Sequence, residues 1–278
     1  MFKALLARVQ QGHRTIGFPQ TAPVLPDRLR GRPVLDPARC PEGCRECVEV
    51  CPTTAITIDP AGVQLDLGRC LFCPECEHAC PHGAIRFTQE YRLATRQRPH
   101  LILDQPPRRS EPPEALAMRE VDSAPYRLAQ ALDQKARRLF GRSLKLRQVS
   151  AGGCNGCEAD VNVLNTVVFD LGRFGVQFVA SPRHADGLLI TGPVPRNMHL
   201  ALRKTYEAVP PPKLVIAVGA CAISGGPFLD HAEVHNGADG IVPVDLYIPG
   251  CPPHPITILD GLLRYLGRIQ EDQPVPGS

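Results

Sequence analysis

The chain has 278 residues, a hydrophobic content of 43% and a formal net charge of only +3, so it can bury one large core or two ordinary ones. The near-balanced charge gives no broad electrostatic basis for binding nucleic acid, and no apolar run approaches the roughly 20 residues that span a bilayer. Twelve cysteines, with no secretory signal at the start of the chain, favour metal ligation over disulfides.

The first hundred residues contain an internal repeat. The segment "LDPARC" at 35–40 matches "LDLGRC" at 65–70, and "CPTTAITI" at 51–58 matches "CPHGAIRF" at 80–87. Each half predicts a cysteine loop, a short helical turn and a strand, with proline and glycine supplying the tight turns. We therefore expect one supersecondary unit used twice, which forms an N-terminal α+β domain over residues 1–100.

The cysteine spacing in this region is typical of two-cluster bacterial ferredoxins. The second repeat reads Cys-x2-Cys-x2-Cys-x3-Cys-Pro, and the first repeat is one residue longer between its first two cysteines. In the ferredoxin pattern, three closely spaced cysteines bind one 4Fe–4S cluster and the fourth binds the other. Paired zinc knuckles are the alternative, but they do not explain the proline after each fourth cysteine. We expect one cluster on Cys40, Cys44, Cys47 and Cys80, and another on Cys51, Cys70, Cys73 and Cys76.

A change of composition separates this domain from the rest of the chain. Residues 99–125 are rich in proline and charge and predict a linker, and residues 126–141 predict an amphipathic helix that bridges two domains. We assign residues 101–142 to this linker and bridging helix.

From residue 144 onward, predicted strands and helices alternate, which indicates an α/β domain over residues 143–278 with a doubly wound, flavodoxin-like parallel sheet. The strands are expected at 144–150, 176–181, 185–192, 213–219 and 245–250, and the helices at 157–172, 195–209 and 255–269.

The remaining four cysteines each follow a predicted strand of this second domain. Cys154 and Cys157 follow the first strand, Cys221 follows "KLVIAVG" and Cys251 follows "DLYIPG". The carboxyl ends of parallel strands share one edge of a sheet, so these four thiols are expected to converge there. Nearby glycines allow the backbone to approach a bulky cofactor. A third 4Fe–4S cluster, a four-cysteine zinc site and a redox-active dithiol of Cys154 and Cys157 are the three interpretations.

Several longer motifs resemble a known family. The stretches "GGCNGCEADV", "HADGLLITGPV", "LVIAVGACAISGGPF" and "YIPGCPPHPITILDGLL" resemble the small electron-transfer subunit shared by NiFe hydrogenases and respiratory complex I, where it is the 20 kDa subunit. Residues 1–100 resemble the two-cluster ferredoxin subunit of the same complexes, and their first segment is like that of formate hydrogenlyase ferredoxin subunits. The chain is thus expected to fuse two neighbouring subunits.

The opening motif distinguishes two branches of this family. The complex I protein has adjacent cysteines there, whereas this chain has Cys154-Asn155-Gly156-Cys157, the spacing of the hydrogenases. The resemblance therefore favours a formate-hydrogenlyase-like, group 4 membrane hydrogenase, with the equivalent component of a complex I-like quinone oxidoreductase as the alternative. A zinc-stapled assembly scaffold is the alternative from another functional class.

The resemblance also implies the role of the chain. It would be an oxidoreductase subunit that transfers electrons through three 4Fe–4S clusters and has no catalytic residue of its own. Cys154, Cys157, Cys221 and Cys251 would hold the proximal cluster, facing a large subunit like that of NiFe hydrogenases or the 49 kDa subunit of complex I. Membrane-arm subunits and a soluble electron donor or acceptor are the other expected partners, and the expected location is the cytoplasmic face of the cell membrane.

Glu158 follows directly after Cys157 and admits two interpretations. It could relay protons or form a hydrogen bond near the cluster, or it could be an acidic residue in the first turn of a helix, where the helix dipole favours it. The sequence leaves this choice open.

Overall fold

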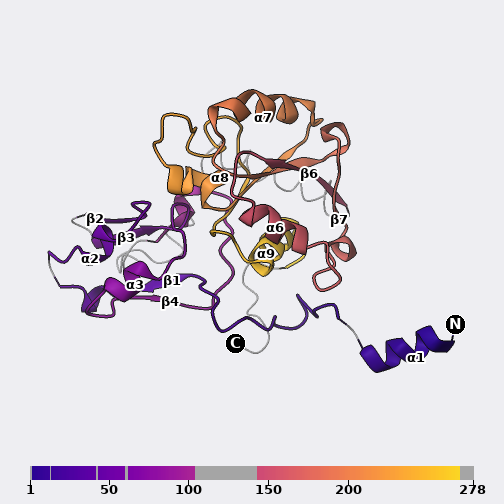
Figure 1. The fold of residues 1–278 in the computed structure, drawn as a ribbon, viewed down its shortest axis with the longest axis horizontal. Coiled ribbons are helices and arrows are strands. Elements are labelled where there is room, and N and C mark those ends of the chain that lie inside the picture. Colours follow the sequence, from indigo (N-terminus) through magenta and orange to yellow (C-terminus); the bar gives the residue numbers. More distant parts are fainter. Residues whose placement is uncertain (1, 13, 42, 60–61, 104–142, 270–278) are drawn as a thin grey trace, which may run out of the picture.

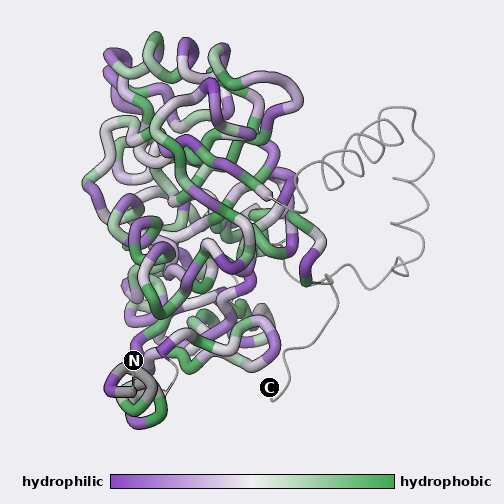
Figure 2. Tube along the Cα trace, turned by 90° about the vertical axis from the view of Figure 1, so that its right-hand side faces the viewer, coloured by the Kyte–Doolittle hydropathy of each residue, from purple (hydrophilic) through white to green (hydrophobic). Residues whose placement is uncertain are grey.

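The computed structural model describes residues 2–12, 14–41, 43–59, 62–103 and 143–269, which form a smaller lobe and a larger α/β body (Figure 1). Helix α1 (Phe2–Gln11) stands clear of both in Figure 1 and is seen nearly end-on beside the N label in Figure 2. Within these ranges, no helix combines the length and the apolar character that crossing a bilayer requires.

The smaller lobe is built from the predicted repeat. The first half is β1 (Pro33–Leu35), α2 (Glu46–Glu49) and β2 (Ile56–Asp59), and the second is β3 (Gly62–Asp66), α3 (Glu75–Ala79) and β4 (Ile85–Phe87). Strand β1 pairs with β4 and strand β2 with β3, both antiparallel, so the two halves exchange strands.

A further short strand extends the lobe into the predicted linker. Strand β5 (Ile102–Leu103) pairs with β3, after a 3₁₀ helix over Arg98–Leu101. The first residues predicted as linker are therefore part of the small lobe. The helix predicted over 126–141 lies outside the described residues.

The α/β body confirms the predicted fold class. Its five strands are all parallel and lie in the order β10-β9-β8-β6-β7. Numbered along the chain, this is the 2-1-3-4-5 order of flavodoxin-like sheets, whose switch point lies between the first and third strands. The strands are β6 (Leu144–Ser150), β7 (Val176–Phe178), β8 (Gly187–Thr191), β9 (Leu214–Val218) and β10 (Leu246–Ile248).

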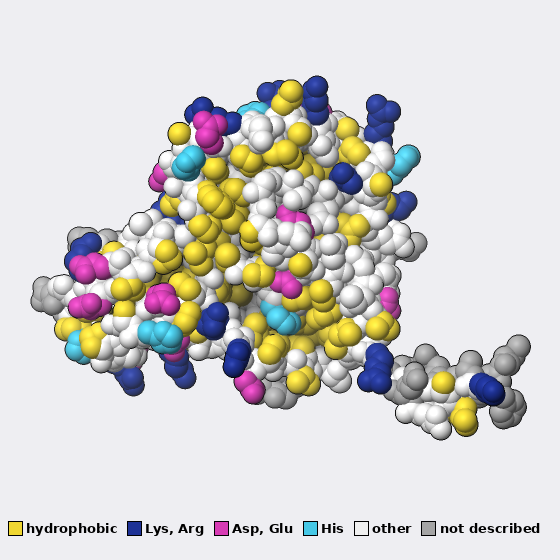
Figure 3. Space-filling view, in the orientation of Figure 1, with side chains coloured by type: hydrophobic (Ala, Val, Ile, Leu, Met, Phe, Trp, Pro, Cys, Tyr) yellow, Lys and Arg dark blue, Asp and Glu magenta, His cyan; other side chains and the backbone are white. Residues whose placement is uncertain are grey.

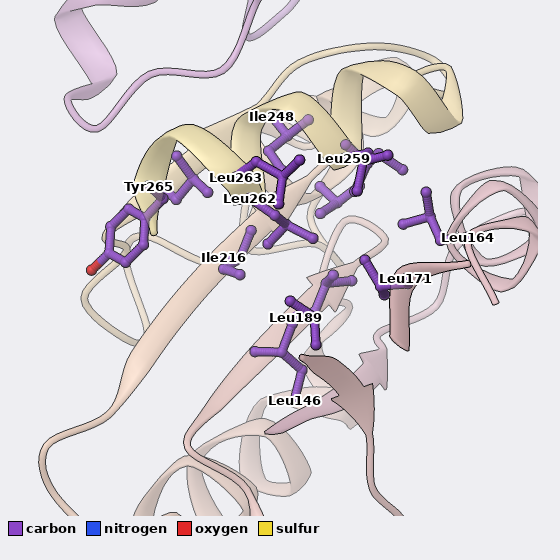
Figure 4. Close-up of a cluster of buried hydrophobic side chains, with 14 of the residues drawn as sticks. Leu146, Leu164, Leu171, Leu189, Ile216, Ile248, Leu259, Leu262, Leu263 and Tyr265 are labelled. Carbon is purple, nitrogen blue, oxygen red and sulfur yellow. The ribbon is translucent and has the colours of Figure 1, made fainter. Parts of the chain in front are cut away.

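Helices cover both faces of this sheet because its strands bury side chains on both sides. Leu189 of β8 packs with Ile216 in the core beneath α9 (Pro255–Tyr265), as Figure 4 shows. Its neighbour Leu188 points the other way and packs with Leu202 of α7 (Arg196–Ala208). Successive side chains of a strand thus pack into two cores, one on each face of the sheet, as expected for a sheet covered on both faces. The remaining helices are α6 (Gly156–Val163) and α8 (Ala220–Ser224).

The helix predicted over 157–172 is too long, since α6 ends at Val163. Beyond it, the carbonyl oxygens of Val167 and Val168 accept hydrogen bonds from the Thr15 hydroxyl and the Ile16 amide. These donors lie about 150 residues earlier in the chain, so a distant segment satisfies backbone groups that a longer helix would have paired.

Residues 14–31, which we name the N-terminal strap, tie the chain's start to the α/β body. Phe18 is 2% exposed and belongs to the same core as α9, and the Arg173 guanidinium donates a 2.9 Å hydrogen bond to its carbonyl oxygen. The first hundred residues therefore contribute to the core of the second unit as well as forming their own lobe.

Candidate functional site

The twelve cysteines are all free thiols and fall into three groups of four. We name them the outer group, the middle group and the sheet-edge group. The outer group is Cys40, Cys44, Cys47 and Cys80; the middle group is Cys51, Cys70, Cys73 and Cys76; the sheet-edge group is Cys154, Cys157, Cys221 and Cys251.

The outer group brings together three thiols of the first repeat and one of the second. All four line a single cavity beside Leu35 and Ile85. Burial raises the pKa of Cys47, and the charges of the other three thiols raise it further. The fourth cysteine of the second repeat thus crosses to the first, as the ferredoxin spacing predicts.

The middle group shows the reciprocal exchange. Burial raises the pKa of Cys70 to about 12, with further contributions from the charges of Cys76, Cys51 and Cys73. Cys51 comes from the first repeat and the other three from the second. Each repeat therefore lends its fourth thiol to the other group.

The turn after each fourth cysteine presents backbone amides to its sulfur. The Ala55 amide donates to Cys51 Sγ over 3.2 Å, and the Ala84 amide donates to Cys80 Sγ over the same distance. Desolvation acts to raise the pKa of Cys80, but hydrogen bonds from Ala84 and the neighbouring amides lower it overall. The turn at Cys80 therefore favours a thiolate, which is the form that binds metal.

The sheet-edge group forms where the carboxyl ends of three strands meet. Cys154 and Cys157 follow β6, Cys221 lies in α8 directly after β9, and Cys251 follows β10. Burial raises the pKa of Cys221 to about 12, with added contributions from the charges of Cys251 and Cys154. The predicted convergence at the edge of the sheet is therefore present.

Two glycines make room for these sulfurs. A Cβ at Gly219 would lie 2.5 Å from Cys157 Sγ, and one at Gly226 would lie 2.8 Å from Cys221 Sγ. Both residues also have positive φ, at 89° and 56°, which side chains rarely adopt. The pair keeps the space beside the thiols open for a bulky group.

The chemistry of the donors fits iron–sulfur clusters. Each group offers four soft thiol ligands, which suit Fe–S clusters and zinc alike, while the amides aimed at Cys51 and Cys80 are the kind of hydrogen bonds that tune cluster potentials. Within the described ranges, no three Cys, His, Asp or Glu side chains come close enough to hold a single metal ion. Ligands of a multi-iron cluster stand around its corners, farther apart than ligands of one ion.

The middle group adjoins both of the others. Cys70 and Cys76 pack in the same buried core as Cys47 of the outer group. Phe72, two residues after Cys70, lines the same pocket as Cys251 of the sheet-edge group. The three groups can therefore be followed from the outer group through the middle group to the sheet edge.

Glu158 is buried beside the sheet-edge group, with 5% of its surface exposed. Ser150 at the end of β6 and Thr191 at the end of β8 each donate a 2.6 Å hydrogen bond to its Oε1. Desolvation opposes ionisation, but these two hydrogen bonds lower the pKa of Glu158 overall. The carboxylate therefore fastens together two neighbouring strands of the sheet, a role that sequence spacing did not indicate.

Two segments of the chain match known families. Residues 154–265 match the family described as the 20 kDa subunit of NADH ubiquinone oxidoreductase. Residues 30–84 match the family described as a 4Fe–4S dicluster domain.

Individual relatives come from hydrogenase and respiratory complexes. Formate hydrogenlyase subunit 7 of Escherichia coli is 47% identical over 130 residues, which cover 47% of this chain and 51% of that protein. A probable membrane-bound hydrogenase subunit of Pyrococcus furiosus is 42% identical over 48% of this chain and 79% of that protein. A NADH-quinone oxidoreductase subunit of Rubrobacter xylanophilus is 50% identical over 38% of this chain and 43% of that protein.

Proposed function

Because the chain belongs to the family of the 20 kDa subunit of NADH ubiquinone oxidoreductase, we propose that it is an iron–sulfur electron-transfer subunit of a hydrogenase-like membrane complex. The match to a 4Fe–4S dicluster domain supports iron–sulfur clusters in the smaller lobe. A third cluster at the sheet edge is part of the proposal.

The serial arrangement of the three thiol groups is the observation that carries this function. The outer group lies in the small lobe, the sheet-edge group lies in the α/β body, and the middle group adjoins both through a shared core and a shared pocket. When bound, iron–sulfur clusters supply one-electron transfer. A chain that holds three such sites in a row can conduct electrons from one of its ends to the other.

The chain's own residues prepare these sites. Burial holds the thiols of Cys70, Cys76 and Cys221 protonated at neutral pH, so the middle and sheet-edge sites take up metal in exchange for protons. The amides at Cys51 and Cys80 donate to the sulfurs, which stabilises negative charge there. The sheet holds the third set of thiols on rigid strand ends.

The sheet-edge group is open to solvent on one side. Cys154 and Cys251 are exposed, and hydrophobic side chains gather on the face where the small lobe meets the α/β body (Figure 3). A large partner subunit covering this edge would exclude water from the site, since burial and solvent exposure both tune cluster potentials. We place the catalytic centre on that partner, and the membrane attachment on further subunits of the complex.

The opening motif favours a hydrogenase of the formate hydrogenlyase type. Cys154 and Cys157 are separated by two residues, Asn155 and Gly156, which is the spacing expected of the hydrogenases. The relatives named for formate hydrogenlyase and membrane-bound hydrogenase support this assignment. The 50% identity to a subunit of NADH-quinone oxidoreductase favours a quinone-reducing complex as the second candidate.

Metal analysis tests the proposal. Anaerobically purified protein should contain about twelve iron atoms per chain and give EPR signals of reduced 4Fe–4S clusters. A value near eight would remove the third cluster, and stoichiometric zinc in a colourless protein would support a scaffold instead. Two Cys-x2-Cys pairs in the co-purifying large subunit are expected for a NiFe hydrogenase; without them, the quinone-reducing candidate stands.

A further inference from the structure

A buried hydrogen bond joins the loops that carry the middle and sheet-edge thiols. Ser224, which is 7% exposed, donates through its hydroxyl to the carbonyl oxygen of Gly68 over 2.9 Å. Gly68 lies two residues before Cys70, and Ser224 lies three residues after Cys221. This contact therefore places a loop of one thiol group directly against a helix of the next.

Close packing reinforces the same contact. A Cβ at Gly68 would lie 2.8 Å from Ile223 Cγ2 and 2.8 Å from Arg98 Cζ. Neither neighbour yields easily: Ile223 is 4% exposed in a core shared by both lobes, and Arg98 is held at both of its terminal nitrogens by Asp66, at 2.8 Å and 2.5 Å. The glycine is thus the residue that lets the two lobes approach this closely.

Backbone pairing holds the lobes together at a second point. Thr95 and Tyr247 exchange two backbone hydrogen bonds of 3.0 Å and 2.8 Å, and Tyr247 lies in β10, the strand before Cys251. A side chain added at Gly68 would push the two lobes apart at one point while the Thr95–Tyr247 pairing holds them together at another. The separation or the tilt of the two thiol groups would therefore change.

We infer that Gly68 and Ser224 are positioning residues that set the separation of the middle and sheet-edge thiol groups, and through it the rate of electron exchange between them. The inference rests on the proposed function, since it needs a cluster in each group. Electron tunnelling falls off exponentially with distance, so a shift of a fraction of an ångström between rigid sites changes its rate.

The test measures magnetic coupling and rate separately from cluster content. In the anaerobically purified complex, Gly68→Ala should keep the wild-type iron content and reduction potentials. It should weaken the EPR spin–spin interaction between the two reduced clusters and slow electron transfer between them severalfold. Ser224→Ala should shift both readouts in the same direction by less. Gly240→Ala, where a Cβ meets nothing within 4 Å, and Ser181→Ala, outside the contact between the lobes, are the matched controls.

A second-site variant guards against simple misfolding. Ile223→Ala removes one of the two groups that a Cβ at residue 68 would strike, and Arg98 remains as the other, so Gly68→Ala/Ile223→Ala should recover part of the wild-type spin interaction. A fully loaded Gly68→Ala protein with unchanged coupling and rate would overturn the inference. If the wild-type protein carries only two clusters, the proposed function is wrong and the inference falls with it. Iron content of the wild-type protein distinguishes this outcome from a failure of the inference alone.

Discussion

The structural role of His254, at the edge of the sheet, depends on the protonation state of its imidazole ring. It caps α9, since its Nδ1 accepts a 3.2 Å hydrogen bond from the Ile256 amide. Only a neutral imidazole has a ring nitrogen free to accept this bond. Burial lowers the pKa of His254, so the folded protein favours the form that caps the helix.

This cap predicts a pH dependence of stability. Because the folded-state pKa lies below the unfolded value of 6.5, the contribution is complete above pH 6.5 and is lost as the pH falls towards the folded pKa. His254→Asn supplies an acceptor that does not titrate, so its unfolding midpoint should fall less between pH 7.5 and pH 5. The difference should correspond to about 1 kcal/mol, the usual size of a helix cap. Parallel losses in both proteins would contradict this role.

At the scale of elements, the strand-end loops create the third thiol group. Strands β6, β9 and β10 end at the same edge of the sheet, so thiols nearly 100 residues apart in the chain meet there. The loops must also leave space beside the cysteine sulfurs, which a side chain would fill. Gly219, between β9 and α8, meets this need because it has no side chain and holds φ at 89°.

We predict that Gly219→Ala abolishes the sheet-edge site while sparing the small lobe. The added methyl group would lie 2.5 Å from Cys157 Sγ and would force a rarely adopted backbone conformation. Iron content should fall from about twelve to about eight atoms per chain, with the ferredoxin-type EPR signals retained. Gly240→Ala should keep all the iron, since its methyl group meets nothing within 4 Å. Full iron content in Gly219→Ala would show that the site tolerates this methyl group.

At the scale of the whole molecule, the two lobes share one core. Leu65 and Leu101 of the small lobe pack in the same buried set as Ala217, Ile223 and Tyr247 of the α/β body. A core of this kind resists independent motion, since an interface that is continuous with both interiors has no hinge. The lobes are therefore expected to unfold together.

Leu101→Ala tests this coupling. Leu101 is fully buried, so its truncation should cost about 2–5 kcal/mol of unfolding free energy. Hydrogen exchange should accelerate in β9 and α8 of the α/β body as well as in the small lobe. Ile102→Ala, at a neighbouring side chain that is 39% exposed, is the matched control and should change stability by less than about 0.5 kcal/mol. Faster exchange in the small lobe alone would contradict a shared core.

Sequence patterns predicted the local features of the fold but not the features formed by segments that are distant in the chain. The repeat, the five parallel strands and the convergence of Cys154, Cys221 and Cys251 followed from spacing and strand ends. The end of α6 did not, because its neighbouring carbonyls are paired with Thr15 and Ile16. The choice of ligands within each thiol group stays a prediction that metal analysis must test.

The sequence by itself determined which chemistry the chain could support, because cysteine spacing and strand periodicity are local properties of neighbouring residues. It predicted two groups of cysteines in which each repeat supplies the fourth cysteine of the other, and a third group at the edge of a doubly wound sheet. Only the tertiary structure decided how the groups are arranged in series, because the Ser224–Gly68 contact and the shared core join residues far apart in the chain. Glu158 illustrates the same division: its place in the first turn of a helix could be read from the sequence, but its role as a tie between Ser150 and Thr191 could not.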